Sequence, residues 1–189
     1  MCGGRGTRLD APVEKPLVDI CEQPMLDRVA ETLEQSRVEA IHAVTSPHTT
    51  ATRARANELG LNCIDAPGEG YVSDLGYALD RVSRPVVTVV ADLPLLRPDH
   101  VDAIIEAADG GSLTACVPVD LKRDLGSSVD ELLVFDYRDT TVCPTGLGVV
   151  GPDKPETDAD STVYLTTDFR LALNVNRPTD IALAEDRCE

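Results

Sequence analysis

The sequence predicts an α/β fold in which helices flank a mostly parallel sheet. Two observations support this prediction. Over residues 24–108, segments with the 3.6-residue period of a helix alternate with short apolar segments. Residues 86–90 (VVTVV) are also continuously apolar or β-branched, which is typical of a central parallel strand buried on both faces.

The elements of the first half follow in order from their apolar patterns. A helix is expected over residues 24–35, because Met25, Val29 and Leu33 share one face and Pro24 suits a first turn. Further helices are expected from residue 46 or 47 to about residue 60, over 70–82 and over 97–109, and strands over 39–46, 61–66 and 85–94.

The second half contains mainly strand-like segments joined by polar turns. Strands are expected over residues 113–119, 131–138, 140–150 and 161–165, and a last helix begins near Pro178. No linker, repeat or low-complexity segment separates the halves. We therefore expect residues 1–189 to form one domain, with a first half over 1–110 and a second over 111–189.

Charge and composition exclude several functions. The formal net charge of -16 repels nucleic acids and anionic membranes, and 3% aromatic residues leave no platform for stacking single strands. Three lysines beside 14 arginines, with abundant Asp, are typical of cytoplasmic proteins from salt-loving organisms; ordinary acidic solubility is the alternative. Because we find neither a membrane-length apolar run nor a secretory signal, we expect a cytoplasmic location without a membrane span.

The six cysteines show neither a Cys-x-x-Cys pair nor a zinc-like spacing with histidine. In a chain of this size without a signal peptide, we expect all six to be reduced thiols, several of them in the core, with a structural disulfide as the alternative.

The first sixteen residues, MCGGRGTRLDAPVEKP, combine glycines with basic side chains. Glycines let backbone N–H groups approach phosphate oxygens, while Arg8 can contact two oxygens and Lys15 supplies a compact charge. The stretch is not a Walker loop, which needs Gly-Lys-Ser/Thr at a helix start. A flexible glycine-rich terminus with incidental charges is the alternative.

Three later stretches have chemistry that fits this loop. Asp92 lies near the end of the strand expected over residues 85–94 and can hold Mg²⁺ at the carboxyl edge of the sheet, unless it only caps the following turn. Residues 66–71 (APGEGY) permit close approach of a flat base, although the residue types alone favour a plain strand-to-helix loop. Residues 174–180 (NVNRPTD) offer asparagine oxygens for a metal, or an asparagine cap for the helix at Pro178.

These stretches, in this order, resemble the superfamily of molybdenum-cofactor guanylyltransferases and sugar-phosphate nucleotidyltransferases. The shared motifs appear here as GGRGTRL, KPL, ADLPLL and NVNRPTD, and they span nearly the whole chain. The resemblance implies a Rossmann-like fold of the nucleotide-diphospho-sugar transferase type. Relatives begin with about five apolar residues before the glycine loop, so we expect the first strand to be truncated to Met1 and Cys2.

Within that superfamily the chain most resembles the archaeal GTP:adenosylcobinamide-phosphate guanylyltransferases, because of its length, its GEGYVSDL stretch and its acidity. Such enzymes move GMP from GTP to a phosphorylated corrinoid in cobalamin biosynthesis and release pyrophosphate. The resemblance also implies Mg²⁺ as cofactor and is compatible with a homodimer. It makes the first half the nucleotide-binding half and the second the acceptor side.

The resemblance also implies roles for individual residues. Lys15, Asp92 and Arg8 are the expected catalytic residues, and Asp92 with Asn176 the expected metal ligands, Asn174 being the other choice. The remaining expected contacts are with the nucleotide (Gly3, Gly4, Arg5, Gly6, Thr7, Gly68, Glu69 and Gly70) and with the acceptor (Thr145 and Gly146).

Two other functions stay open at this point. The acceptor could instead be molybdopterin or a sugar phosphate, with the same chemistry. Alternatively, the chain could bind GTP without turnover, because a missing central strand leaves unpaired backbone groups and a hole in the core.

Overall fold

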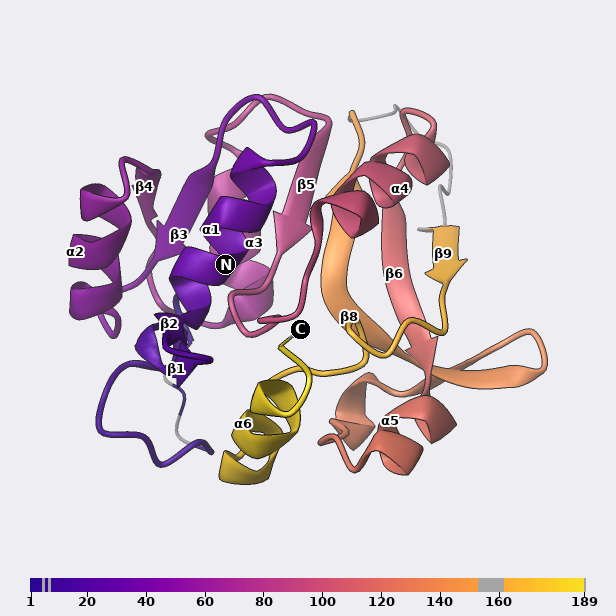
Figure 1. Cartoon of the computed structure of the whole chain (residues 1–189). Helices are drawn as coiled ribbons and strands as arrows, with labels where there is room; N and C mark the ends of the chain where they lie inside the picture. The colour runs from indigo at the N-terminus through magenta and orange to yellow at the C-terminus, as the bar shows by residue number, and fades with distance from the viewer. Residues whose placement is uncertain (5, 7, 153–161, 189) are drawn as a thin grey trace.

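A computed structural model describes residues 1–4, 6, 8–152 and 162–188 of the chain (Figure 1). Arg5 and Thr7, which we expect to contact the nucleotide, lie outside the described residues. None of the helices in the described part of the chain combines the length and apolar character needed to cross a membrane.

The predicted alternation of helices and strands in the first half is confirmed. Residues 15–24 add a short helical turn and a two-stranded hairpin that the apolar pattern did not reveal. In chain order the elements are η1 (Lys15–Leu17), β1 (Asp19–Ile20), β2 (Gln23–Pro24), α1 (Met25–Glu34), β3 (His42–Thr45), α2 (Thr50–Glu58), β4 (Asn62–Asp65), α3 (Tyr71–Leu79), β5 (Val86–Val89) and α4 (Pro98–Ala108).

The second half follows the predicted order with two differences. The elements are β6 (Leu113–Pro118), α5 (Val119–Leu125), η2 (Glu131–Leu133), β7 (Phe135–Tyr137), β8 (Thr140–Val150), β9 (Thr162–Leu165) and α6 (Pro178–Glu185). We did not predict α5, and the strand expected over residues 131–138 is a short helical turn followed by only three strand residues. Helix α6 begins at Pro178 as expected.

The sheet is mixed, which corrects the prediction of a mostly parallel one. Its strand order is β5-β8-β6-β9, with β7 also paired to β8. Strand β8 runs antiparallel to β5, β6 and β7, whereas β6–β9 and the separate pair β3–β4 are parallel. The long β8 therefore sets the direction of most pairings in the main sheet.

Met1 and Cys2 lie between β3 and β5, where we expect the stub of a truncated first strand. Cys2 N donates to Val44 O at 2.8 Å, and Ala91 N donates to Met1 O at 3.2 Å. A largely apolar groove of about 760 Å³ continues beside β3 and β5. Residues 86–88 are therefore only half-buried, which corrects the expectation that the strand is buried on both faces.

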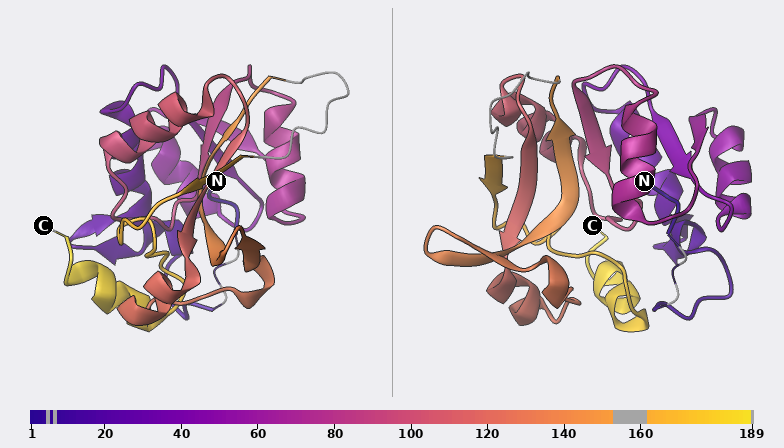
Figure 2. Two further views of the ribbon diagram at one scale, coloured as in Figure 1. Left: turned by 90° about the vertical axis from the view of Figure 1, so that its right-hand side faces the viewer. Right: turned by 180° about the vertical axis from the view of Figure 1, so that it is seen from behind.

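Helices cover both faces of the sheets. Helices α1 and α4 lie on the face turned to the viewer in Figure 1, and α3 lies behind, as the reverse view in Figure 2 shows. The largest core cluster joins α1 and α4 to β5, β6 and β8; it includes Val29, Ile104, Val117 and Leu147. This packing fixes the end of β5, where Asp92 lies.

A disulfide between Cys21 and Cys188 contradicts the expectation that all cysteines are reduced. Its Cα atoms are 6.5 Å apart and 167 residues separate the two cysteines in sequence. It joins the segment between β1 and β2 to the residues that follow α6. The other four cysteines (Cys2, Cys63, Cys116 and Cys143) are free.

Candidate active site

A pocket of about 420 Å³ lies at the carboxyl end of β5. Predicted site residues from three stretches line it: Gly3, Gly4 and Lys15 from the first sixteen residues, the loop of residues 68–70, and Asp92. The structure therefore brings these residues together around one pocket.

Lys15 lies at the centre of the polar contacts in this pocket. Its Nζ donates to Asp92 Oδ2 at 2.5 Å and to Asn176 Oδ1 at 2.8 Å. The Lys15 and Asp92 side chains are only 16% and 20% exposed, so water screens this ion pair incompletely. The pair holds the ammonium group at the pocket wall, ready to contact an anion.

The same oxygens are chemically suited to a divalent cation. Asp92 Oδ2 and Asn176 Oδ1 converge on one positive centre, the Lys15 ammonium, and both are the hard oxygen ligands that Mg²⁺ prefers. Within the described residues, no cluster of three or more His, Cys, Asp or Glu could hold a metal unaided. A metal here would therefore share its coordination with substrate oxygens, as is usual for Mg²⁺ in phosphate chemistry.

The glycine loop is shaped to carry Lys15. Gly6 has a positive φ of 61°, and a Cβ added there would lie 2.8 Å from Lys15 Cβ. Ser46 Oγ donates to Gly3 O at 2.8 Å, which ties the start of the loop to the end of β3. Glu14 accepts hydrogen bonds from Ala51 N and Thr52 N at 2.9 and 2.7 Å and thereby ties its end to the first turn of α2.

The loop of residues 68–70 is held by Asp74 on α3. Asp74 is buried, and its Oδ1 accepts from Gly68 N at 2.9 Å and from Glu69 N at 3.3 Å. Tyr71 also lines the pocket. Burial raises the pKa of Tyr71, and the charge of Asp92 adds to this rise, so the hydroxyl stays protonated at neutral pH. Sequence reasoning included Tyr71 only in the stretch of residues 66–71 and assigned no function to Asp74.

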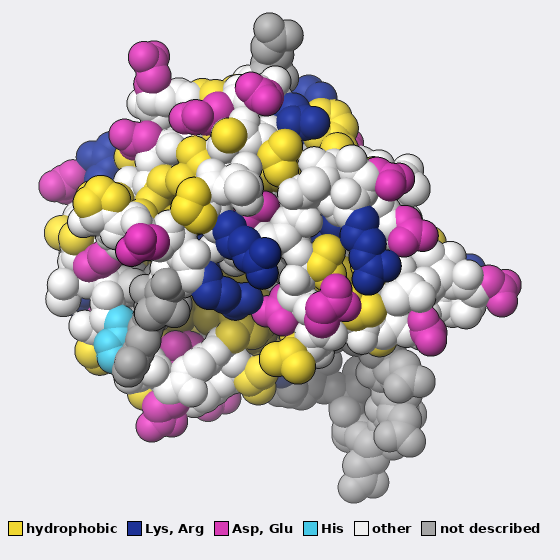
Figure 3. Space-filling view, turned by 90° about the horizontal axis from the view of Figure 1, so that it is seen from below, with side chains coloured by type: hydrophobic (Ala, Val, Ile, Leu, Met, Phe, Trp, Pro, Cys, Tyr) yellow, Lys and Arg dark blue, Asp and Glu magenta, His cyan; other side chains and the backbone are white. Residues whose placement is uncertain are grey.

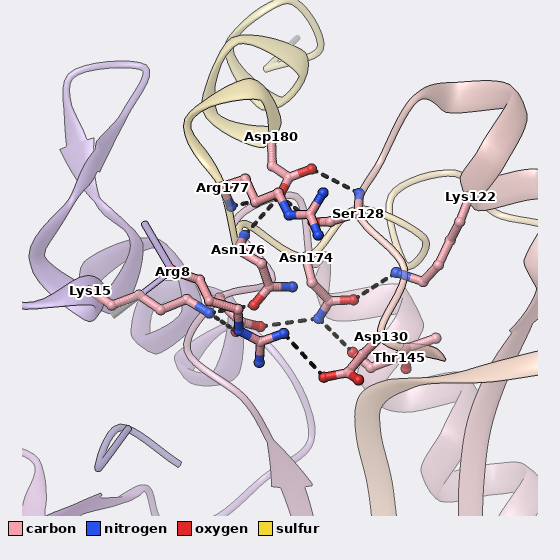
Figure 4. Close-up of polar contacts among 11 residues, drawn as sticks. Arg8, Lys15, Lys122, Ser128, Asp130, Thr145, Asn174, Asn176, Arg177 and Asp180 are labelled. Atoms are coloured by element: carbon pink, nitrogen blue, oxygen red, sulfur yellow. Dashed lines mark hydrogen bonds and ion pairs between the residues drawn. The ribbon is translucent and has the colours of Figure 1, made fainter. Parts of the chain in front are cut away.

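Arg8 lies apart from the pocket lining. Its guanidinium Nη1 is 3.2 Å from Asp130 Oδ2, and its side chain is 64% exposed. Figure 4 shows Arg8 passing in front of the Lys15 contacts toward Asp130. Arg8 therefore connects the glycine loop to the second half of the chain and would have to leave Asp130 to reach a bound phosphate.

The predicted acceptor residues lie beside the pocket on β8. Thr145 is buried, with its Oγ1 accepting from Leu147 N at 3.1 Å. Gly146 has a positive φ of 87°, and a Cβ there would lie 2.3 Å from Val90 Cγ2. The structure therefore gives both residues packing roles at the end of β5.

A buried polar network that sequence reasoning missed supports Asp92 from behind. Lys122 Nζ donates to Asn174 Oδ1 at 3.0 Å, and Asn174 Nδ2 donates to Asp92 Oδ1 at 3.0 Å and to Thr145 O at 2.9 Å. Burial lowers the pKa of Lys122, although Cys143, Asp92 and Asp180 act in the opposite direction. Because the chain has only three lysines, the rarity of this residue could have drawn attention to Lys122.

Asp180 fixes the backbone that carries Asn176. Fully buried, it accepts from Asn176 N at 2.9 Å, from Arg177 N at 2.8 Å and from Ser128 N at 2.9 Å. The N-cap of α6 is Arg177, so the alternative of an asparagine cap is wrong. Asp180 therefore links the start of α6 to the loop after α5, as Figure 4 shows.

The surrounding surface is acidic with a basic centre. Seen from below, Lys and Arg side chains gather near the middle of the face, and Asp and Glu side chains are spread around them (Figure 3). In a chain with a net charge of -16, such a local gathering offers an anion a place to bind.

An α/β fold with a mixed sheet, a glycine loop and a lysine–carboxylate pair at a strand end defines a nucleotidyltransferase-like protein. The sequence model of the family described as the MobA-like NTP transferase domain matches residues 1–145, and the chain belongs to that family of nucleotidyltransferases. Asn174, Asn176 and Asp180 lie beyond this match.

Individual relatives extend the comparison. The chain is 28% identical to an adenosylcobinamide-phosphate guanylyltransferase from Methanocaldococcus jannaschii, over 98% of this chain and 93% of that protein. It is 30% identical to a 3-deoxy-manno-octulosonate cytidylyltransferase from Anaeromyxobacter dehalogenans, over 53% of this chain and 43% of that protein. A Bacillus anthracis structure assigned as a glucose-1-phosphate thymidylyltransferase has a TM-score of 0.66 at 14% identity, covering 98% of this chain and 92% of that one.

Proposed function

We propose that the chain transfers GMP from GTP to adenosylcobinamide phosphate, giving adenosylcobinamide-GDP and pyrophosphate. One observation carries the choice of this reaction within the family. The identity to the guanylyltransferase from M. jannaschii extends over 98% of this chain and 93% of that protein. The pocket at the end of β5 supports the chemistry, whereas GTP and the corrinoid rest on that relative and on the resemblance in sequence.

The reaction requires little covalent chemistry from the side chains of the protein. An oxygen of the acceptor phosphate bonds to the α-phosphorus of GTP while the bond from that phosphorus to the β-phosphate bridging oxygen breaks. A phosphate monoester is already nucleophilic at neutral pH, so a strong general base is not required. The protein then contributes positioning and charge neutralisation.

We assign charge neutralisation to Lys15 and Arg8. Lys15 is held at the pocket wall by Asp92 and Asn176, within reach of a triphosphate. Gly3 and Gly4 line the same pocket and can present backbone N–H groups to phosphate oxygens. Arg8 would exchange Asp130 for the nucleotide and meet the charge that develops on pyrophosphate.

The remaining roles complete the proposed site. Asp92 and Asn176 would hold Mg²⁺, which when bound neutralises phosphate charge. The loop of residues 68–70, whose backbone donates hydrogen bonds to Asp74, would lie against the guanine base. For the acceptor we keep Thr145 and Gly146, whose burial restricts them to backbone contacts or to shaping the pocket.

A labelled-substrate assay tests this proposal. The protein is incubated in high salt with Mg²⁺, GTP labelled at the α-phosphate and one of three acceptors: adenosylcobinamide phosphate, molybdopterin or a sugar phosphate. We expect the label to move to the corrinoid. Asp99→Asn provides a matched control, because Asp99 is an exposed carboxylate on α4, outside the pocket.

The other outcomes each contradict the proposal in a distinct way. Label that moves only to molybdopterin or to a sugar phosphate would keep the chemistry and change the acceptor. Binding of GTP without movement of label to any acceptor would make the chain a GTP-binding protein without turnover.

A further inference from the structure

Lys122 is a buried lysine that is connected to the candidate active site through the side chain of Asn174. It is only 2% exposed, and its Nζ donates to Ala172 O at 2.8 Å and to Asn174 Oδ1 at 3.0 Å. Figure 4 shows Lys15 approaching from one side and Lys122 from the other, with Asn176 and Asn174 between them. A buried ammonium group is costly, so the fold keeps Lys122 there against a desolvation penalty.

The partners of Asn174 determine how its amide is oriented. An ammonium group only donates hydrogen bonds, so the amide oxygen must face Lys122. A carboxylate and a carbonyl only accept, so the amide NH₂ must face Asp92 Oδ1 and Thr145 O, at 3.0 and 2.9 Å. The opposite orientation would place NH₂ against an ammonium group and oxygen against a carboxylate.

This orientation has a consequence for Asp92. Asn174 Nδ2 holds Asp92 Oδ1, and Lys15 Nζ meets the other oxygen, Oδ2, at 2.5 Å. We propose that Lys122 and Asn174 are positioning residues, which fix the Asp92 carboxylate so that Oδ2 faces the cation, and that Asn174 is not a metal ligand. The catalytic part of this inference rests on the proposed function.

Lys122 has a second contact that could give it a purely structural role. It shares the acceptor Ala172 O with Ser127 Oγ, which donates to it at 3.0 Å. Ser127→Ala therefore removes a buried hydrogen bond to the same carbonyl without touching Asn174. It is the matched control for Lys122→Met, which keeps an unbranched side chain of similar length and removes the ammonium group.

The first test needs no nucleotide transfer. Exchange of the Asn174 side-chain NH₂ protons with water is measured by NMR in the protein alone. We expect slow exchange in the native chain, because both protons are hydrogen-bonded, and at least about tenfold faster exchange in Lys122→Met but not in Ser127→Ala. The inference would be overturned if these protons exchanged at the rate of a free amide in the native chain. It would also be overturned if they exchanged as slowly in Lys122→Met as in the native chain.

The second test uses turnover. Losing a partner that orients a metal ligand typically costs about 10- to 100-fold, so we expect kcat to fall by that much in Lys122→Met and Asn174→Ala, with the KM for GTP changed less than about threefold. Because Lys122 acts through Asn174, the double variant should be no slower than Asn174→Ala. If the kcat losses of the two single variants multiply in the double variant, Lys122 acts independently of Asn174.

Asn174→Asp separates positioning from metal ligation, also if Lys122→Met fails to fold. The new carboxylate would face Asp92 without a donor, so we expect kcat at or below that of Asn174→Ala. Activity near that of the native chain, with half-saturation at a lower Mg²⁺ concentration, would instead make residue 174 a ligand. If no acceptor takes up label, the proposed function fails while the NMR measurement still decides the orientation of Asn174.

Discussion

The two walls of the pocket are built in different ways. The loop wall comprises Gly3, Gly4, Lys15 and the loop of residues 68–70, with Gly6 next to Lys15; apart from the Lys15 and Glu69 side chains it presents mainly backbone and glycine surface. The network wall consists of Asp92, which lines the pocket, and of buried or half-buried residues that support it or one another from behind: Lys122, Thr145, Asn174, Asn176 and Asp180. Backbone amides suit phosphate oxygens, which can lie in several positions, whereas a cation needs oxygens at fixed positions. The difference indicates that the loop wall binds and the network wall positions.

The largest effect is expected at Asp92, on the network wall. Asp92→Asn keeps the shape but loses the charge that faces Lys15 and a metal. We expect kcat for label transfer to fall on the order of 10²- to 10³-fold while the chain still folds. Asp99→Asn on α4 should stay within about twofold of the native rate, and near-native turnover by Asp92→Asn would remove it from the catalytic residues.

The second prediction concerns the disulfide that anchors the network wall. Helix α6 is held at its start by Asp180 and after its end by the bond from Cys188 to Cys21. Reduction should lower the free energy of unfolding by about 2–4 kcal/mol, because the bond closes a very long loop. Denaturant unfolding with and without reductant measures this, and Cys21→Ser serves as the variant that reductant should no longer affect. If reductant lowers the free energy of unfolding of Cys21→Ser by the same amount, the loss does not come from this disulfide.

A smaller effect is expected on the loop wall at Gly6. Gly6→Ala puts a methyl group against Lys15 at a positive φ, and we expect this strain, about 1–2 kcal/mol, to be relieved by displacing Lys15 from the pocket wall. A loss of that size from the bound state corresponds to roughly tenfold weaker GTP binding. Gly60→Ala is the matched variant, since Gly60 lies outside the pocket lining and also has a positive φ, of 74°, but a Cβ there would meet no described atom within 4 Å. Calorimetric titration with GTP should show the larger loss in Gly6→Ala. The reverse order would mean that the loop does not act through Lys15.

The smallest effect is expected at Glu14. Burial raises the pKa of Glu14, but hydrogen bonds from Thr52 and Ala51 outweigh it, and the net pKa lies below its ordinary value. The carboxylate therefore stabilises the fold above the unfolded-state pKa, near 4.3, and this contribution is lost as the pH falls through the lower folded-state pKa. Glu14→Ala should cost about 1 kcal/mol at pH 7 and progressively less in acid, measured by denaturant unfolding. A cost that does not change with pH would contradict this.

Much of this fold follows from local patterns, and its exceptions have physical reasons. The periodicity of residues 24–108 predicted the order of helices and strands, and Pro178 predicted the start of α6. The direction of β8 could not be predicted, because alternation within a strand is the same in parallel and antiparallel pairs. The disulfide was missed because 167 residues separate Cys21 from Cys188, and spacing alone does not pair cysteines that are so distant.

The residues of the site also divide into those that a local motif predicts and those that it does not. Lys15 and Asp92 were predicted as site residues because a short motif carries each of them, and the structure places the two side chains in contact. The support of Asp92 by Lys122 through Asn174 joins positions 52 residues apart and depends on β6, α5 and β8 being packed together. Such long-range support leaves no local motif, although the rarity of lysine, three in 189 residues, could have drawn attention to Lys122.

The most direct test of the account follows both ends of the triphosphate in one reaction with adenosylcobinamide phosphate. GTP labelled at the α-phosphate and GTP labelled at the γ-phosphate are used in parallel, with Lys15→Ala as the variant that removes the central ammonium group. The account predicts α-label in the corrinoid product and an equal amount of γ-label in pyrophosphate for the native chain, with both reduced on the order of 10²- to 10³-fold in Lys15→Ala. Release of the γ-label as inorganic phosphate, or equal transfer by Lys15→Ala, would contradict it.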